Sequence, residues 1–299
     1  MSELLEGVVL DDFLKNDGDP YLRSREKETL LSGQNLTIAQ VVGKVLFTIP
    51  TSGTLTSGTN GSLLVVTGGT KTQKGDYKVT CTQANAGGAA GIYRVESPTG
   101  EVLGDVTLAL GTSPAAAAFT DPQINFEVDY LTGYNTVGDY WTISVTDGSL
   151  GVTVISWTAV DGSQKAYGIM AGAIDASSAD TYCAVIKRSP AVITKSFLRY
   201  PLTFTSGGTA DAPVAGDTLT GLTTTTTVCR VVSVTIDSGT FSGGTAAGTI
   251  IVDQLTADFT AENVEINDST TNDMTVALTN VTQVFLDLAD AGIIFREEA

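Results

Sequence analysis

The sequence predicts a mainly β protein: a small β-rich core with one C-terminal helix, interrupted by two β-sandwich-like insertions. Glycine occurs 32 times in 299 residues, and threonine, serine and valine are abundant, as is typical of strands and turns. Several segments alternate apolar and polar residues with a period of two. A single segment, close to the C-terminus, has the spacing of an amphipathic helix.

The core begins with two expected strands, at residues 27–31 and 41–49. The second is almost continuously apolar, which predicts a strand buried on both faces. Pro50 and the Thr-, Ser- and Gly-rich residues after it mark the start of the first insertion.

The first insertion is expected to span residues 51–156. Strands are predicted at 77–81, 124–128 and 141–145, where each strand can bury one face and expose the other. Glycine-containing turns recur between them at the intervals of an antiparallel sandwich.

A second, smaller β-insertion is expected at residues 203–279. It again alternates apolar and polar residues, for example at 232–236 and 274–278. The predicted helix follows, because its apolar residues recur at i, i+3, i+4, i+7 and i+8 and Gly292 stands where a helix ends. These residues are Val281, Val284, Phe285, Leu288 and Ala289. Residues 293–295 should then return to the core as a strand.

Residues 1–26 are predicted to form an N-terminal arm with an apolar side and a short helical turn around residues 10–15. Its acidic segment 15–20 suggests a calcium loop, but with Gly18 at the sixth position of an EF-hand loop, Phe13 and Lys15 occupy positions that require oxygen ligands. A plain turn is the better interpretation.

The charge and hydropathy of the chain limit the classes of partner that it is expected to bind. The chain has 33 acidic and 16 basic residues, a net charge of −17 that would repel a phosphate backbone, so no nucleic-acid partner is expected. No apolar run approaches the ~18 residues of a membrane helix. The N-terminus is acidic where a signal peptide would be basic, so we expect no membrane partner and synthesis in the host cytoplasm.

The residues that usually carry catalysis are scarce. The chain has no histidine, and Cys81, Cys183 and Cys229 are too scattered for a disulfide framework or a thiolate metal site. Residues 68–75 lack the spacing of a phosphate-binding loop. The carboxylate pairs at 11–12 and 297–298 lie in terminal segments without a dry pocket. The sequence therefore predicts no catalytic residue, metal site or cofactor, and no enzymatic activity.

Three blocks of sequence carry a resemblance to a known family. The central block 157–201 contains DGSQKAYGIM, VIKRSPAVI and then Leu198, Tyr200 and Pro201. Upstream, residues 21–45 contain an S-R-E tripeptide, S-G-Q and V-G-K, and residues 286–296 read LDLADAGIIFR. In this order the blocks resemble the core of the lambda-type bacteriophage head decoration proteins, which stabilise the capsid.

The resemblance implies a discontinuous decoration-protein core, formed by residues 27–50, 157–202 and 280–299, and a capsid-binding arm at 1–26. It also implies a homotrimer seated at local three-fold positions on the outer surface of the expanded capsid, where it contacts the phage major capsid protein and resists internal genome pressure. The residues expected at the capsid are Leu4, Leu5, Val8, Phe13, Tyr21, Arg23, Arg25 and Glu26.

Two other functions stay open. The chain could be a phage surface adhesion module whose β-insertions bind a glycan or another part of the host surface. It could also be a hydrolase that relies on carboxylates brought together from distant loops. Arg23, Arg25 and Lys27 could instead be solvated charges at the edge of a strand, where they discourage edge-to-edge aggregation.

Overall fold

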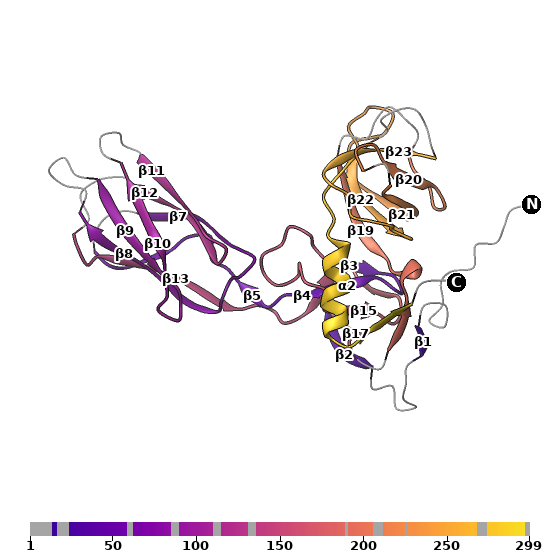
Figure 1. The fold of residues 1–299 in the computed structure, drawn as a ribbon, viewed down its shortest axis with the longest axis horizontal. Coiled ribbons are helices and arrows are strands. Elements are labelled where there is room, and N and C mark those ends of the chain that lie inside the picture. The colour runs from indigo at the N-terminus through magenta and orange to yellow at the C-terminus, as the bar shows by residue number, and fades with distance from the viewer. Residues whose placement is uncertain are drawn as a thin grey trace, which may run out of the picture. The chain divides into compact units, whose positions relative to one another are not determined.

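The computed structural model of the chain describes residues 14–16, 24–58, 62–84, 90–109, 115–130, 136–188, 191–205, 212–224, 226–267 and 274–296. In this part of the chain, strands predominate and one α-helix lies near the C-terminus (Figure 1), so the predicted mainly β class is confirmed. The chain divides into two compact units. Unit 1 draws on residues up to Lys44, on Gly151–Ala159 and on residues from Ser163 onward; unit 2 comprises Val45–Leu150 and Val160–Gly162.

A small closed barrel forms the base of unit 1. Its strands, in spatial order, are β14 (Val152–Val154), β2 (Arg25–Leu30), β17 (Thr181–Ile186), β15 (Gly168–Met170) and β4 (Val41–Lys44). The short strands β3 (Gln34–Leu36) and β16 (Ile174–Ala176) pair beside it. Leu30, Val42, Met170 and Val185 are fully buried in one hydrophobic cluster. Residues from distant parts of the sequence therefore share one interior.

A three-stranded sheet attaches the N-terminal segment to unit 1. Strand β1 (Leu14–Asn16) pairs antiparallel with β18 (Val192–Thr194), and β25 (Ile294–Arg296) pairs parallel with the other side of β18. Leu14 stands opposite Ile193, and both are buried in one cluster. The expected helical turn at residues 10–15 is therefore wrong at Leu14 and Lys15, which are extended because they pair with β18; residues 10–13 lie outside the described part.

The single α-helix of the described residues is α2 (Val281–Asp290), as the spacing predicted. Its buried residues are Val281, Val284 and Leu288. The Asn280 side chain caps its first turn by accepting from the Gln283 amide, and Gly292 follows with a φ of 86°, which a glycine adopts without strain. The C-terminal end of the helix thus has the predicted glycine, whereas the Asn280 cap was not predicted.

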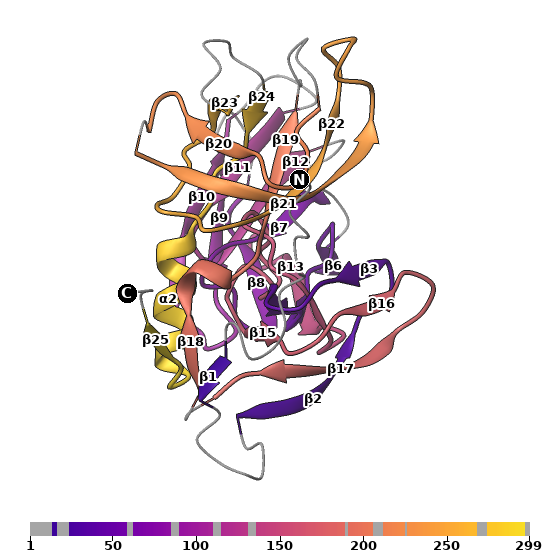
Figure 2. The ribbon, with the colours of Figure 1, turned by 90° about the vertical axis from the view of Figure 1, so that its right-hand side faces the viewer.

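A second closed barrel in unit 1 contains most of the segment expected as the second insertion. Its strands, in spatial order, are β19 (Tyr200–Thr205), β22 (Ala247–Asp253), β21 (Val228–Ser238), β20 (Thr218–Gly221), β23 (Glu262–Ile266) and β24 (Met274–Val276). Figure 2 shows these strands above α2 and β18. Phe204 and Phe259 belong to the same buried cluster as Leu14 and Val284. The second barrel therefore shares a hydrophobic core with α2 and the three-stranded sheet, and Val41, Ile169 and Ile186 of the base barrel also belong to it. The interior of the base barrel forms a separate cluster.

Unit 2 contains most of the segment expected as the first insertion and has a separate core. One sheet has the order β10-β9-β8-β13-β5, with β6 also pairing β13, and the other has the order β11-β12-β7. Trp141, Tyr77 and Tyr93 are fully buried in its hydrophobic cluster. The strands are β5 (Phe47–Thr48), β6 (Thr54–Ser57), β7 (Ser62–Gly68), β8 (Gly75–Gln83), β9 (Gly91–Glu96), β10 (Val102–Leu108), β11 (Ala115–Thr120), β12 (Ile124–Tyr130) and β13 (Tyr140–Asp147). The three predicted alternating strands lie within β8, β12 and β13.

The predicted strand at residues 41–49 is wrong in its extent. The structure has β4 and β5 there, separated at Val45 and Leu46. The reason is a change of partner, because β4 pairs with β14 and β15 whereas β5 pairs with β13. A continuous apolar run gives no sign of such a change.

Candidate functional site

The residues predicted to contact the capsid fall into two groups. Leu4, Leu5, Val8, Phe13, Tyr21 and Arg23 lie outside the described residues. Arg25 and Glu26 are the first two residues of β2, in the small barrel. Because β1 and β2 both belong to unit 1, the expected arm is held by the folded body at Leu14 and again from Arg25 onward.

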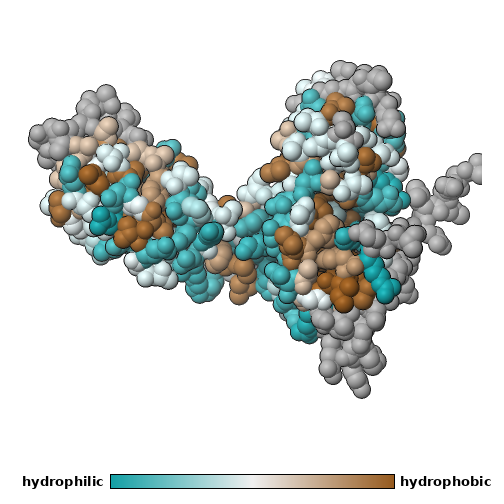
Figure 3. All heavy atoms as spheres, viewed as in Figure 1, coloured by the Kyte–Doolittle hydropathy of each residue, from teal (hydrophilic) through white to brown (hydrophobic). Residues whose placement is uncertain are grey.

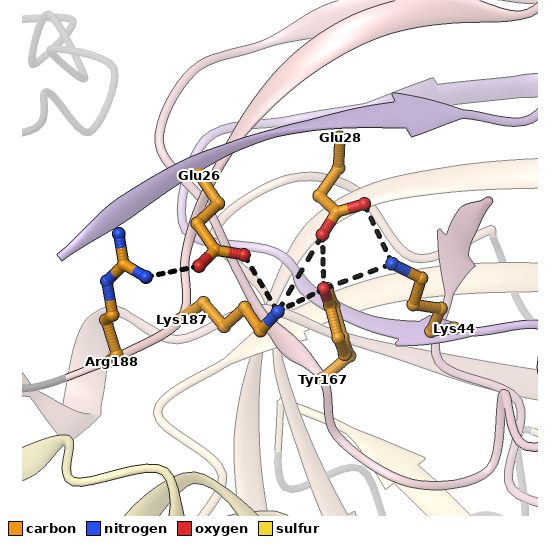
Figure 4. Close-up of polar contacts among 6 residues, drawn as sticks. All are labelled: Glu26, Glu28, Lys44, Tyr167, Lys187 and Arg188. Carbon is orange, nitrogen blue, oxygen red and sulfur yellow. Dashed lines mark hydrogen bonds and ion pairs between the residues drawn. The ribbon is translucent and has the colours of Figure 1, made fainter. Parts of the chain in front are cut away.

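Glu26 belongs to a group of polar side chains that we call the charged cluster. It consists of Glu26, Glu28, Lys44, Tyr167, Lys187 and Arg188 (Figure 4). Glu26 and Glu28 stand opposite Val185 and Cys183 across the β2–β17 pair. Directly opposite residues of an antiparallel pair share a face. The two carboxylates are therefore on the face of β2 that bears the apolar barrel interior.

Hydrogen bonds connect residues of β2 and β4 with Tyr167, which precedes β15, and with Lys187 and Arg188, which follow β17. The Lys44 Nζ donates to Glu28 Oε2 at 2.9 Å and to the Tyr167 hydroxyl at 3.1 Å, and that hydroxyl donates to Glu28 Oε1. The Lys187 Nζ donates to Glu26 Oε2 at 2.8 Å and also to the Tyr167 hydroxyl. Arg188 donates to the second oxygen of Glu26. Tyr167 thus joins two ion pairs into one network.

The electrostatics of the cluster favour its charged form. Hydrogen bonding from Lys187 lowers the pKa of Glu26, against the opposing effect of burial. Burial alone would lower the pKa of Lys44, but hydrogen bonds to Glu28 and Tyr167 outweigh it and raise that pKa; Lys187 shows the same balance with Glu26 and Tyr167. Groups that stay charged around neutral pH are unsuited to acid–base catalysis. The cluster ties β2 to β4 and to the residues next to β15 and β17.

An open hollow, which we call the outer hollow, lies along the β2–β17 pair. Its volume is about 510 Å³, and it is lined by Arg25, Glu26, Lys27, Ile174, Tyr182, Cys183 and Ala184. The Tyr182 side chain is 66% exposed, and the Lys27 Nζ lies 3.5 Å from the centre of its ring. A large exposed aromatic residue beside cations is a common feature of protein contact surfaces.

Figure 3 shows apolar surface in the region of α2 and β25. Two exposed apolar residues come from these elements: Leu286 of α2 is 55% exposed, and Ile294 of β25 is 54% exposed. Their sequence neighbours Phe285 and Phe295 pack edge to face with ring centres 5.0 Å apart. In the described sheet, β25 is an edge strand with β18 on one side. We call Leu286 and Ile294 the apolar patch.

The described residues hold no group of three or more cysteine or acidic side chains placed to bind a metal ion. No helix among them combines the length and the apolar character needed to cross a bilayer. Cys81, Cys183 and Cys229 are free and buried, and burial raises the pKa of the Cys183 thiol to about 11. The carboxylate pairs at 11–12 and 297–298 lie outside the described part.

Glu26 was predicted from the sequence, but its hydrogen-bond partners, the outer hollow and the apolar patch were not. A signal was present for Glu28, since residues two apart in a strand share a face. Lys44, Tyr167 and Lys187 are distant in the sequence, and no local pattern links them to Glu28. Leu286 and Ile294 could not be recognised as exposed, because the spacing of a short helix leaves the orientation of its flanking residues undetermined.

The fold defines a mainly β protein with two closed barrels in unit 1, a separate sandwich-like unit 2 and an N-terminal strand that pairs with β18. A more specific class comes from comparison with protein families, because the model of the family described as bacteriophage lambda head decoration protein D matches residues 4–222. The chain belongs to this family, as the resemblance predicted. Comparison with curated proteins and with solved structures gave no match.

Family membership supports a role in decorating a phage capsid and a location at the capsid surface of the virion. The family is one of structural proteins. The match includes the first and central blocks identified in the sequence and the first insertion between them, and it ends before the block at 286–296.

Proposed function

We propose that the protein binds the outer surface of an expanded phage capsid as a homotrimer at local three-fold positions, and that it stabilises the shell against the pressure of the packaged genome. Its partner is the phage major capsid protein, and it acts without catalysis. The family match supports decoration. Strand β1 is anchored in the core of unit 1, so a pull of the shell on the arm would be passed to the folded body.

The arm needs a fixed point of attachment if it is to hold the shell. Leu14 is buried and pairs with Ile193, so the apolar residues before it, Leu4, Leu5, Val8 and Phe13, are tethered to a rigid body. If an arm adds a strand to the shell, about five hydrogen bonds at ~1 kcal/mol each nearly balance the cost of ordering it. Three arms on one trimer raise the affinity by roughly 10² to 10⁴ through effective concentration.

The charged cluster and the outer hollow suggest which residues near β2 contact the capsid. The Glu26 carboxylate is bound by Lys187 and Arg188, which favours a supporting role for it at the capsid interface. Arg25 and Tyr182 both line the outer hollow, and we assign that hollow to the capsid contact together with Tyr21 and Arg23. The apolar patch is better suited to subunit contacts, because stable oligomer interfaces are more apolar than transient ones.

Removing residues 1–13 tests the role of the arm. A deletion of 1–26 would also remove Leu14 and Glu26, which belong to the folded body, whereas the shorter deletion retains both. We expect the shortened protein to keep the native mass of a trimer and to lose co-sedimentation with expanded capsids of its own phage. Full-length protein is the control, and undiminished loading of the shortened protein would remove the arm from the mechanism.

A substitution in the apolar patch tests the assigned subunit contact. Leu286→Lys should place like charges together at a trimer interface and shift the native mass toward the monomer, as measured by light scattering. Leu278→Lys is the matched control, since Leu278 is similarly exposed and lies outside the patch. If both variants remain trimeric, the apolar patch is not the subunit contact; a monomeric wild type would contradict the trimer itself.

A further inference from the structure

Unit 1 also contains a pocket that the capsid role does not use, which we call the uncharged pocket. Its volume is about 180 Å³, smaller than the pockets of drug-sized ligands, so it suits a ligand of a single ring. It is lined by residues 154–158 at and after the end of β14, by β19 and β22, and by the residues that follow β24. None of the described residues that line it carries a charge, although the chain has 33 acidic and 16 basic residues.

The Trp157 side chain, which is half-buried, forms a rigid apolar part of this lining. Its indole N–H donates to the Pro201 carbonyl at 2.8 Å, and its ring centre lies 6.3 Å from that of the buried Tyr200. The polar edge of the indole is therefore already bonded, and the ring is left to offer apolar surface to a ligand. Leu278, which is 51% exposed, adds to that surface.

The second barrel supplies hydroxyl groups to the same pocket. Thr203 of β19 and Thr249 of β22 stand directly opposite each other, so their side chains share a face of the sheet. Leu202 and Phe204, on either side of Thr203, are buried in the hydrophobic core, so the two threonines are on the outer face of the barrel. Both line the pocket. A hydroxyl group can donate and accept, which allows each threonine to bond to a ligand hydroxyl group.

This combination of groups selects a class of ligand. An anion would find no cation in the described lining and would be repelled by a chain with a net charge of −17. A hydrocarbon would remove water from the threonine hydroxyl groups without bonding to them. An uncharged sugar matches both parts of the lining, because its ring has apolar faces of C–H groups and a rim of hydroxyl groups.

We propose that the uncharged pocket binds a neutral sugar. One ring lies against Trp157 and Leu278, and its hydroxyl groups bond to Thr203 and Thr249. Because the pocket is formed within one chain, the inference does not depend on the proposed capsid role.

Fluorescence titration tests the proposal, since Trp157 is the only tryptophan in a Trp141→Phe background. The probes are glucose, galactose, mannose and N-acetylglucosamine, with cyclohexanol as an apolar ring that has one hydroxyl group. At least one sugar should give a saturable change and bind about tenfold more tightly than cyclohexanol, because it forms additional hydrogen bonds. Cyclohexanol binding at least as tightly as every sugar, or no saturable change with any sugar, would overturn the proposal.

Glucuronate and galacturonate test whether the ligand is uncharged. They carry a carboxylate that glucose and galactose lack, and each should bind at least about tenfold more weakly than the preferred neutral sugar, because the described lining offers no cation to a desolvated carboxylate. Equal or tighter binding of either acid would contradict a neutral ligand.

Substitutions locate the site, with binding of the preferred sugar measured by calorimetry. Thr203→Val and Thr249→Val each remove a hydroxyl group while keeping a branched side chain, and each should weaken binding by about threefold to tenfold. Thr235→Val is the matched control, because Thr235 is exposed and stands opposite Thr249 on β21 but is outside the pocket lining. Thermal unfolding checks that each variant is folded. Equal weakening by all three, or no weakening by either pocket variant, would overturn the assigned site.

Discussion

At the scale of single residues, Glu262 is a buried carboxylate whose partners in the described part of the chain are amides and a hydroxyl group. It accepts hydrogen bonds from the amides of Thr223, Thr224 and Thr260 and from the Thr224 hydroxyl. Gly221 permits this approach, because a Cβ there would lie 2.8 Å from Glu262 Oε2. Burial alone would raise the pKa of Glu262, but the hydrogen bonds outweigh it and lower that pKa.

Glu262→Gln should lower the free energy of unfolding by about 1–3 kcal/mol at neutral pH, because a charged acceptor is replaced by an amide that leaves buried donors poorly paired. Since the folded-state pKa is lowered, the stabilisation is present above about pH 4.3, the ordinary value for glutamate, and is lost as the pH falls through the folded-state pKa. Urea unfolding at several pH values measures the difference from wild type.

The half-buried Glu265 of the same strand gives the control, Glu265→Gln. A Glu262→Gln penalty that is equally large at pH 3 and pH 7 would contradict the assignment to the ionised carboxylate.

At the scale of elements, the position of α2 is set by a residue outside the helix. The Asp258 carboxylate accepts from the Val281 and Thr282 amides and from the Thr282 hydroxyl, the last at 2.7 Å. The backbone amides in the first turn of a helix have no partner within the helix, and Asp258 accepts hydrogen bonds from two of them. Its negative charge also interacts favourably with the positive N-terminal end of the helix dipole. The loop after β22 therefore clamps the helix that bears the apolar patch.

Asp258→Ala should reduce the free energy of unfolding by about 1–2 kcal/mol, the usual cost of removing a helix cap. Asp290→Ala, at the opposite end of α2, should be neutral or slightly stabilising because an acidic group is unfavourable there. Urea unfolding followed by circular dichroism compares the two. Equal effects would mean that the loss of an acidic side chain, and not the capping geometry, determines the result.

At the scale of the whole molecule, the two units have separate hydrophobic cores. The cluster around Trp141 lies within unit 2, and the two clusters of unit 1 contain none of its residues. The chain has two tryptophans, Trp141 in unit 2 and Trp157 in unit 1. The Trp157 indole N–H donates to the Pro201 carbonyl at 2.8 Å, so its fluorescence reports on unit 1.

This division predicts independent unfolding. In a Trp141→Phe background only Trp157 fluoresces, and in a Trp157→Phe background only Trp141 does. Adding Ile143→Ala, a fully buried position of unit 2, should destabilise unit 2 by about 2–5 kcal/mol and lower the midpoint seen by Trp141. The midpoint seen by Trp157 should stay unchanged in denaturant titrations. A common shift of both midpoints would show that the chain unfolds as one cooperative unit.

Most of what the sequence predicted correctly was local. The helix at Val281–Asp290 and the strands containing Tyr77, Ile124 and Trp141 follow from periodicity, which depends on neighbouring residues alone. The strand across 41–49 failed because its two halves pair with different partners. The motif blocks identified the family, but they did not show that Leu14 is built into the core.

The amino-acid sequence by itself determined the mainly β class, the position of α2, the family and the scarcity of catalytic groups, because each is a property of residue types or of short-range spacing. Only the tertiary structure decided that Glu28, Lys44, Tyr167 and Lys187 meet in one charged cluster, and that the second barrel shares a core with α2 and the three-stranded sheet. These features arise where segments over a hundred residues apart pair or pack, and long-range pairing leaves no signal in local sequence.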